Sequence, residues 1–138
     1  MNDGPQAPTL YEVVGPRFFV DLVDHFYDGV EADPVLLPLY PDTADTTGAR
    51  ERLSMFLAQY WGGPRDYLEK RGHPMLRARH NQWSIGPRER DRWLVHMLGA
   101  LEETVSVLPL DDVAKEEVLA QVAGYVVNAA EHLRNSDG

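Results

Sequence analysis

Apolar side chains recur every three or four positions along most of this chain, which is the period of an α-helix. Thr9 and Glu12 have the spacing of a capping box, and Gly15 can end the short helix that begins there. Pro16 suits the first turn of a second helix, which an Asp-Pro pair at 33–34 ends. The apolar residues of this second helix fall on one face: Phe18, Phe19, Leu22, Val23, Phe26, Tyr27 and Val30.

Three further helices are predicted by the same period. The third resumes near Gly48 and stops at 62–64, and its apolar stripe is Leu53, Phe56, Leu57, Tyr60 and Trp61. The fourth runs from Pro87 to Pro109 with Leu94, Met97, Leu98, Leu101, Val105 and Leu108. Asp111 or Asp112 can cap the last, whose stripe is Leu119, Val122, Ala123, Val126, Val127, Ala130 and Leu133. No strand pattern competes, so we predict an all-α fold.

Residues 62–86 interrupt this regularity with repeated glycines and prolines, and leave room for at most a short helix around Leu76 to His80. Structureless segments longer than roughly 15 residues are uncommon inside compact domains unless they serve a function. A solvated surface linker is the alternative. The segment carries apolar side chains that such a linker would not normally expose, and this favours a region ordered by a ligand: Tyr67, Met75, Leu76, Trp83 and Ile85.

The 138 residues suit one domain, which we place at 9–134 between a disordered tail at 1–8 and a C-terminal tail at 135–138. No apolar run approaches the roughly 18 residues of a membrane span, and the start of the chain lacks the features of a secretory signal. We therefore expect a soluble, cytoplasmic protein. A net charge of -9 makes nucleic acid an unfavourable partner. Without cysteine, any metal ligand must be histidine, methionine or a carboxylate.

Among the five histidines, His80 has a distinctive setting. It follows Arg77 and Arg79, two cations in an otherwise acidic protein, at the end of the irregular segment. Guanidinium groups match the carboxylates of an anionic cofactor, although a solvated basic turn would have the same composition. The other histidines are His25, His73, His96 and His132, and those at 25, 96 and 132 lie in ordinary helical patterns where a packed or surface role is the usual one.

Four motifs stand in and around the irregular segment: Tyr60-Trp-Gly-Gly-Pro-Arg65, Arg71-Gly-His-Pro74, Leu76-Arg-Ala-Arg-His80 and Glu89-Arg-Asp-Arg-Trp93. In residue type and order they closely resemble the group II (O-type) truncated haemoglobins of the globin superfamily. Weaker matches at 26–27, 39–41 and 52–57 extend the resemblance from about Tyr11 to the last helix. It implies a truncated globin fold, a two-over-two helical sandwich around haem.

The resemblance also implies roles for individual residues. His80 matches the histidine that ligates haem iron, and Arg79 matches a residue that pairs with a haem propionate. The cofactor would be haem b, iron protoporphyrin IX. Three aromatic residues match positions near the haem but would serve equally as plain core aromatics: Phe56, Trp61 and Tyr67. The stretch Asn81-Gln82-Trp83 departs from the family pattern, which leaves the path of the chain after His80 open.

On the opposite side of the iron the family places polar aromatics, matched here by Tyr27, Tyr40 and Trp93. Their phenol and indole hydrogens could stabilise negative charge on a bound diatomic ligand. Tyr27 and Trp93 also lie on apolar stripes, so filling the core is the alternative for each alone. The resemblance further places a small residue, Ala49, where it could open a ligand path, with Leu53 as an apolar wall of the pocket.

The expected function is the binding of oxygen, nitric oxide or carbon monoxide to a haem held by His80. Carriage, sensing, nitric oxide dioxygenation and peroxide chemistry remain open within that class, and a redox function would need a reductase that the sequence does not identify. The oligomeric state is equally open, a homodimer included. The competing hypothesis is a cofactor-free helical module whose acidic surface meets a basic partner.

Overall fold

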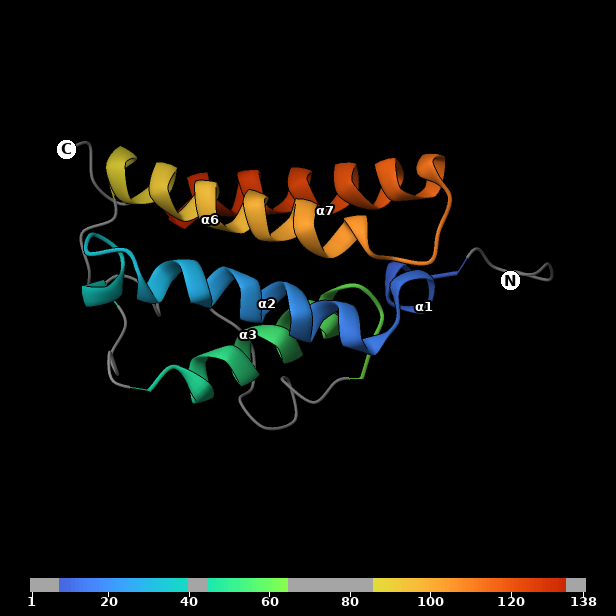
Figure 1. Ribbon diagram of the computed structural model, residues 1–138, viewed down its shortest axis with the longest axis horizontal. Coiled ribbons are helices and arrows are strands. Elements are labelled where there is room, and N and C mark those ends of the chain that lie inside the picture. The colour runs from blue at the N-terminus through green and yellow to red at the C-terminus, as the bar shows by residue number, and fades with distance from the viewer. Residues whose placement is uncertain (1–7, 40–44, 65–85, 134–138) are drawn as a thin grey trace.

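The computed structural model describes residues 8–39, 45–64 and 86–133, and these ranges are helical without strands. Figure 1 shows two helical pairs stacked on each other. One pair is α2 (Pro16–Glu31) and α3 (Thr47–Tyr60), and the other is α6 (Pro87–Ser106) and α7 (Asp112–Leu133). The short helices α1 (Leu10–Val14) and η1 (Leu37–Leu39), the latter of 3-10 type, flank α2. The predicted all-α fold is confirmed.

The entry into α2 follows the predicted local signals. Glu12 N–H donates to Thr9 Oγ1 at 3.2 Å, and Thr9 N–H donates to a Glu12 carboxylate oxygen at 3.0 Å, which completes the capping box. Gly15 ends α1 with φ of 84°, a backbone conformation that only glycine adopts at little cost. Pro16 then occupies the first turn of α2. This junction sets the direction of the central helix.

Helix α2 forms the centre of the core because it contacts both α3 and α6. All seven residues of its predicted stripe are buried, and Phe19, Leu22 and Phe26 have no exposed surface. Removing side chains of this size from water is worth roughly 1.5–3 kcal/mol each. The amphipathic pattern of this one helix therefore determines where the two helical pairs meet.

Two parts of the predicted stripes are wrong. In α7, Val127 is 46% exposed while Val118, which the prediction omitted, is only 3% exposed. The buried face is a narrow row at every fourth position: Val118, Val122, Val126 and Ala130. In α3, Tyr60 is 54% exposed, because it lies at the end of the helix and its ring contacts Tyr125 at 4.3 Å instead of entering the core.

Several predictions fall outside the described residues, among them the short helix around residues 76–80 and both tails. Among the helices that the structure describes, none is long and apolar enough to cross a membrane.

Candidate functional site

Tyr27 and Trp93, two of the three predicted polar aromatics, come together around Phe26 in the core. Phe26 contacts the Tyr27 ring at 5.0 Å and the Trp93 ring at 5.4 Å between centroids, edge to face in both cases. Tyr27 lies on α2 and is 4% exposed, while Trp93 lies on α6 and is partly buried. The packing of α2 against α6 thus places a phenol and an indole on one shared aromatic residue, although 66 positions separate them in the chain.

Helix α3 supplies the apolar side of the site. Ala49 and Leu53 are partly buried and pack against the core, one helical turn apart, and Phe56 follows with 8% exposure. Residues three and four positions apart share one face of a helix. Leu53, the predicted wall of the pocket, and Ala49, predicted to open a ligand path, therefore lie on the face of α3 that meets the core.

Trp61 lies at the end of α3 in an aromatic cluster. Its ring stacks on Phe19 at 6.0 Å and meets Tyr125 edge to face at 5.1 Å. Burial, followed by the influence of Tyr60, raises the pKa of Tyr125 to about 12, so this phenol stays neutral at ordinary pH. These contacts are those of a core aromatic, one of the two roles that the sequence leaves open for Trp61.

Four predicted site residues lie outside the described ranges: Tyr40, Tyr67, Arg79 and His80. The structure neither places them nor relates them to the residues above. Within 8–39, 45–64 and 86–133, no group of three histidine, aspartate or glutamate side chains is arranged to hold a metal ion.

Arg50 on α3 forms a polar cluster beside Tyr27 that the sequence analysis did not identify. Its guanidinium carbon lies 5.6 Å from the centre of the Tyr27 ring, within the range of a cation–π interaction. Three carboxylates of α2 and its end accept hydrogen bonds from it: Asp24 at 3.2 Å, Asp28 at 3.0 Å and Glu31 at 3.1 Å. The α2 and α3 helices are therefore joined at the ring of Tyr27.

The charges of this cluster stabilise each other. A hydrogen bond from Thr46, followed by those from Arg50, lowers the pKa of Glu31. Burial opposes the charge on Arg50, but the hydrogen bonds to its carboxylate partners outweigh this effect and raise the pKa of Arg50. The hydrogen bonds therefore favour the charged forms of both Glu31 and Arg50.

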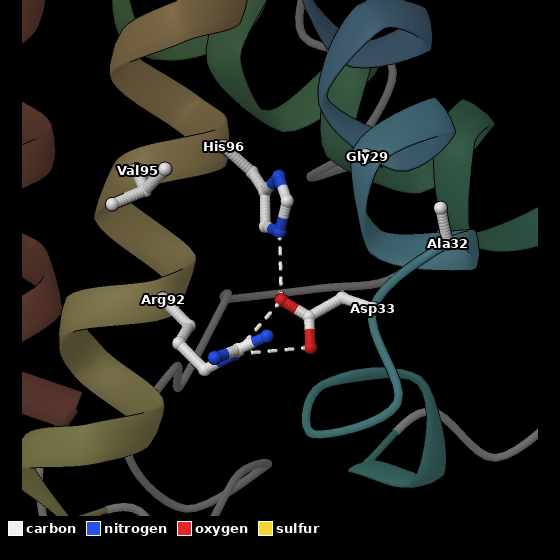
Figure 2. Close-up of a pocket in the computed structure, with 6 residues that line it drawn as sticks. All are labelled: Gly29, Ala32, Asp33, Arg92, Val95 and His96. Atoms are coloured by element: carbon white, nitrogen blue, oxygen red, sulfur yellow. Dashed lines mark hydrogen bonds and ion pairs between the residues drawn. The ribbon is translucent and has the colours of Figure 1, made fainter.

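A second polar cluster joins the end of α2 to α6 and lines an open pocket of about 330 Å³ (Figure 2). Asp33 faces two residues one turn apart on α6. Its carboxylate accepts from Arg92 Nε at 3.1 Å on both oxygens and lies 2.7 Å from His96 Nε2. A Cβ added at Gly29 would lie 2.5 Å from His96 Nδ1, so only glycine lets the imidazole pack this closely against α2.

The Asp33 carboxylate is buried and fully ionised. Burial favours its neutral form, but hydrogen bonds from His96, the Val35 and Leu36 backbone N–H groups and Arg92 more than compensate and lower its pKa from 3.8 to about 2. An ionised carboxylate can only accept, so His96 Nε2 must be the donor of the 2.7 Å bond. This cluster fixes the position of α2 relative to α6, the two helices that carry Tyr27 and Trp93.

In the sequence, His96 lies in an ordinary helical pattern that predicts a packed or surface role, and Asp33 stands out only as part of the Asp-Pro pair that ends a helix. Two local signals were available. An aspartate that ends a helix often accepts from backbone N–H groups two and three residues later, as Asp33 does, and Arg92 and His96 have the i, i+4 spacing of one helical face. Neither signal shows that these two segments meet, because 63 positions separate Asp33 from His96.

We expect the Asp33→Asn substitution to destabilise the fold by roughly 2 kcal/mol near neutral pH. The difference between pKa 3.8 and about 2 corresponds to that amount, and a neutral amide cannot recover the charged hydrogen bonds. Because the folded-state pKa is lowered, this contribution is present above pH 4 and is lost as the pH falls towards 2. Urea unfolding curves of the two proteins should therefore differ at pH 7, and the difference should shrink below pH 4 and become small only near pH 2.

The matched control for this measurement is Asp21→Asn. Asp21 pairs with Arg17 at 3.0 Å on the exposed surface of α2, where an ion pair is worth less than about 1 kcal/mol. Equal destabilisation by the two substitutions, or a difference at Asp33 that persists unchanged to pH 2, would contradict the assignment.

Comparison with known proteins shows which family the chain resembles in sequence. The family model described as bacterial-like globin matches residues 9–128. A curated group 2 truncated hemoglobin, YjbI of Bacillus subtilis, is 42% identical over 102 residues, which cover 74% of this chain and 74% of that protein.

Solved structures give the same result. The hemoglobin of Chloroflexus aurantiacus is similar with a TM-score of 0.84 and 46% identity over 94% of this chain and 100% of that one. The group II truncated hemoglobin of Bacillus anthracis has a TM-score of 0.83 and 34% identity, covering 97% of this chain and 96% of its own.

Proposed function

This chain belongs to the bacterial-like globin family, and within it to the group II truncated haemoglobins, and from that premise we propose that it binds haem b through His80 and a diatomic gas beside Tyr27 and Trp93. Haem-based gas binding follows from the family itself. The identity of the iron ligand, the type of haem and the chemistry of the ligand site are the parts that we propose.

The observation that carries this proposal is the meeting of Tyr27 and Trp93 around Phe26, next to the apolar face of α3. A haem is a flat apolar ring with an anionic edge, and a gas bound on it acquires partial negative charge. The residues fit such a group, because Leu53 offers an apolar wall and Tyr27 and Trp93 offer two hydrogen-bond donors. When bound, haem supplies an iron that takes up a diatomic ligand and can exchange electrons.

The residues that would hold the haem come largely from the segment between α3 and α6. In this proposal His80 ligates the iron and Arg79 pairs with a propionate, while Phe56, Trp61 and Tyr67 contact the ring. Phe56 and Trp61 lie on the core-facing side of α3, which is compatible with that role.

Within the site, the protein's own groups bind and orient the ligand. The Tyr27 hydroxyl and the Trp93 indole N–H, joined in this proposal by the Tyr40 hydroxyl, donate hydrogen bonds to it. Leu53 excludes water, so these hydrogen bonds act in a medium of low dielectric constant and are stronger than they would be in solvent. Ala49 leaves a gap in the α3 wall through which a small molecule can enter.

Several donors around one ligand favour slow release over rapid delivery. On this basis the proposed activity extends to redox chemistry, either oxidation of nitric oxide by bound oxygen or reaction with peroxide. Both would require a reductase to return the iron to its starting state.

The test is an absorption spectrum of the purified ferrous protein with and without carbon monoxide. We expect an intense band near the blue edge of the visible spectrum that shifts on addition of carbon monoxide, because His80 would hold the iron and leave it able to bind a diatomic ligand. A sample that is colourless after haem has been supplied and the unbound haem removed would support the cofactor-free helical module instead. A band that carbon monoxide leaves unchanged would contradict the proposed gas binding.

A further inference from the structure

The guanidinium of Arg50 makes more hydrogen bonds than that of an ordinary surface arginine. All five of its guanidinium hydrogens have an acceptor within 2.9–3.2 Å. Nε donates to the hydroxyl of Thr46, Nη1 donates to the backbone and side-chain oxygens of Asp24, and Nη2 donates to Asp28 and Glu31. The Thr46 hydroxyl in turn donates to Glu31, which closes the network. A guanidinium fixed at every donor has little freedom to rotate or to move along the helix.

The fixed guanidinium lies over the ring of Tyr27, 5.6 Å from its centre. Tyr27 has almost no exposed surface, and Phe26 contacts it from within the core. The phenol ring is therefore bounded by Phe26 and by a cation from α3. Because Arg50 immediately follows Ala49 and precedes Leu53 by three positions, the same turn of α3 supplies both the wall of the pocket and this contact.

The local balance of charge decides whether the cation acts on the ring. The cluster contains one cation and three carboxylates, but the carboxylate side chains are 44–69% exposed, whereas Arg50 is 20% exposed. Water screens the exposed charges strongly and the buried contact weakly. The guanidinium is thus the less screened charge of the cluster and the one that contacts the Tyr27 ring, and electron density drawn towards it makes the hydroxyl a stronger donor.

From this geometry we infer that Arg50 is a positioning residue for ligand binding, which fixes the orientation of the Tyr27 ring and strengthens the hydrogen bond of its hydroxyl to the bound gas. The inference rests on the proposed function, since it requires Tyr27 to face the ligand. It adds a residue outside the pocket that acts on the ligand only through Tyr27.

The experiment is a double-mutant cycle on the oxygen dissociation rate of the ferrous protein, with Arg50→Gln, Tyr27→Phe and the double variant. We expect Arg50→Gln to accelerate oxygen release about threefold to tenfold when Tyr27 is present, the range of a partly buried cation–π contact. In the Tyr27→Phe background the same substitution should change the rate by less than about 1.5-fold, since the hydroxyl through which it acts is gone.

A spectroscopic measurement separates this role from a general loosening of the fold. The C–O stretching frequency of the carbon monoxide complex falls as donors polarise the ligand, so Arg50→Gln should raise it in the presence of Tyr27 and leave it unchanged in Tyr27→Phe. Arg17→Gln is the matched control, because it also removes an arginine paired with an aspartate of α2, but at an exposed position. It should change neither the rate nor the frequency.

Equal effects of Arg50→Gln in both backgrounds, or no effect in either, would overturn the inference while leaving the proposed function intact if Tyr27→Phe itself accelerates release. If Tyr27→Phe has no effect, the ligand role of Tyr27 fails first and the inference fails with it. Should Arg50→Gln not fold, Arg50→Lys provides the same cycle, because it keeps a charge but cannot occupy five acceptors. We expect it to show a smaller acceleration that likewise depends on Tyr27.

Discussion

Replacing His80 with glycine is expected to abolish stable haem binding and the absorption band that accompanies it. The substitution removes the single imidazole that, on our proposal, attaches the iron to the polypeptide. The remaining contacts are apolar packing and one propionate pair, which do not fix the iron in place. Purification with excess haem, followed by an absorption spectrum and a measurement of haem transfer to a competing apoprotein, would give the size of the loss.

Free imidazole should rescue haem binding in the His80→Gly variant. It can enter the space left by the His80 side chain and ligate the iron, so adding it to His80→Gly should restore the band. His25→Gly is the control, since His25 lies on the exposed side of α2 at 3.3 Å from Glu103 and has no proposed part in the site. Normal haem retention by His80→Gly, or an equal loss of haem from both variants, would contradict the proposal that His80 ligates the iron.

The second large effect is expected on the rate at which oxygen dissociates. Replacing Tyr27, Tyr40 and Trp93 together with phenylalanine should accelerate oxygen dissociation from the ferrous protein by roughly 10- to 100-fold. Each substitution removes a hydrogen from a charge-assisted bond worth about 1.5–3 kcal/mol, and the donors share one ligand, so their losses do not add fully. Stopped-flow mixing of the oxygenated protein with excess carbon monoxide would measure the rate.

Tyr60→Phe is the matched control for this measurement. It also removes one phenol hydroxyl, but from a ring that is mostly exposed and contacts Tyr125 at the end of α3. We expect its rate to equal that of the unaltered protein. A triple variant that releases oxygen no faster than this control would show that Tyr27 and Trp93 serve only as core aromatics.

The two polar clusters explain how the helices that carry the site are fixed relative to one another. Both involve α2: Arg50 joins its outer side to α3, and Asp33 joins its end to α6 through Arg92 and His96. The three helices that carry Tyr27, the apolar wall and Trp93 are therefore connected by charged hydrogen bonds as well as by packing. Hydrophobic contact alone allows helices to slide by small amounts, whereas directional hydrogen bonds between charged side chains oppose such sliding.

Local chemistry in the sequence accounts for the helices that begin with distinct signals. The Thr9 capping box, the Gly15 turn and Pro16 each depend on neighbouring residues only, and the structure reproduces them. The stripe of α2 is equally well predicted, because a helix packed on two sides buries every apolar residue of a wide face. The fold class and the family motifs follow from the same short-range information.

The tertiary structure decided which face of α7 is buried and which charged side chains pair, because both depend on which helices pack together. The sequence pattern placed Val127 on the buried stripe of α7 and omitted Val118, whereas in the folded chain Val118 is buried and Val127 is exposed. The ionisable side chains that pair with Asp33 and Arg50 are 19 to 63 positions away, and a charged residue on a helical surface gives no indication of which distant charge it will reach. The spacing of apolar residues predicts which face of one helix is buried. Ion pairs between helices depend instead on the angles at which the helices pack, and the sequence of a single helix does not determine these angles. The sequence thus determined the elements and the candidate donors, and the packing of α2 against its neighbours determined how those donors are held.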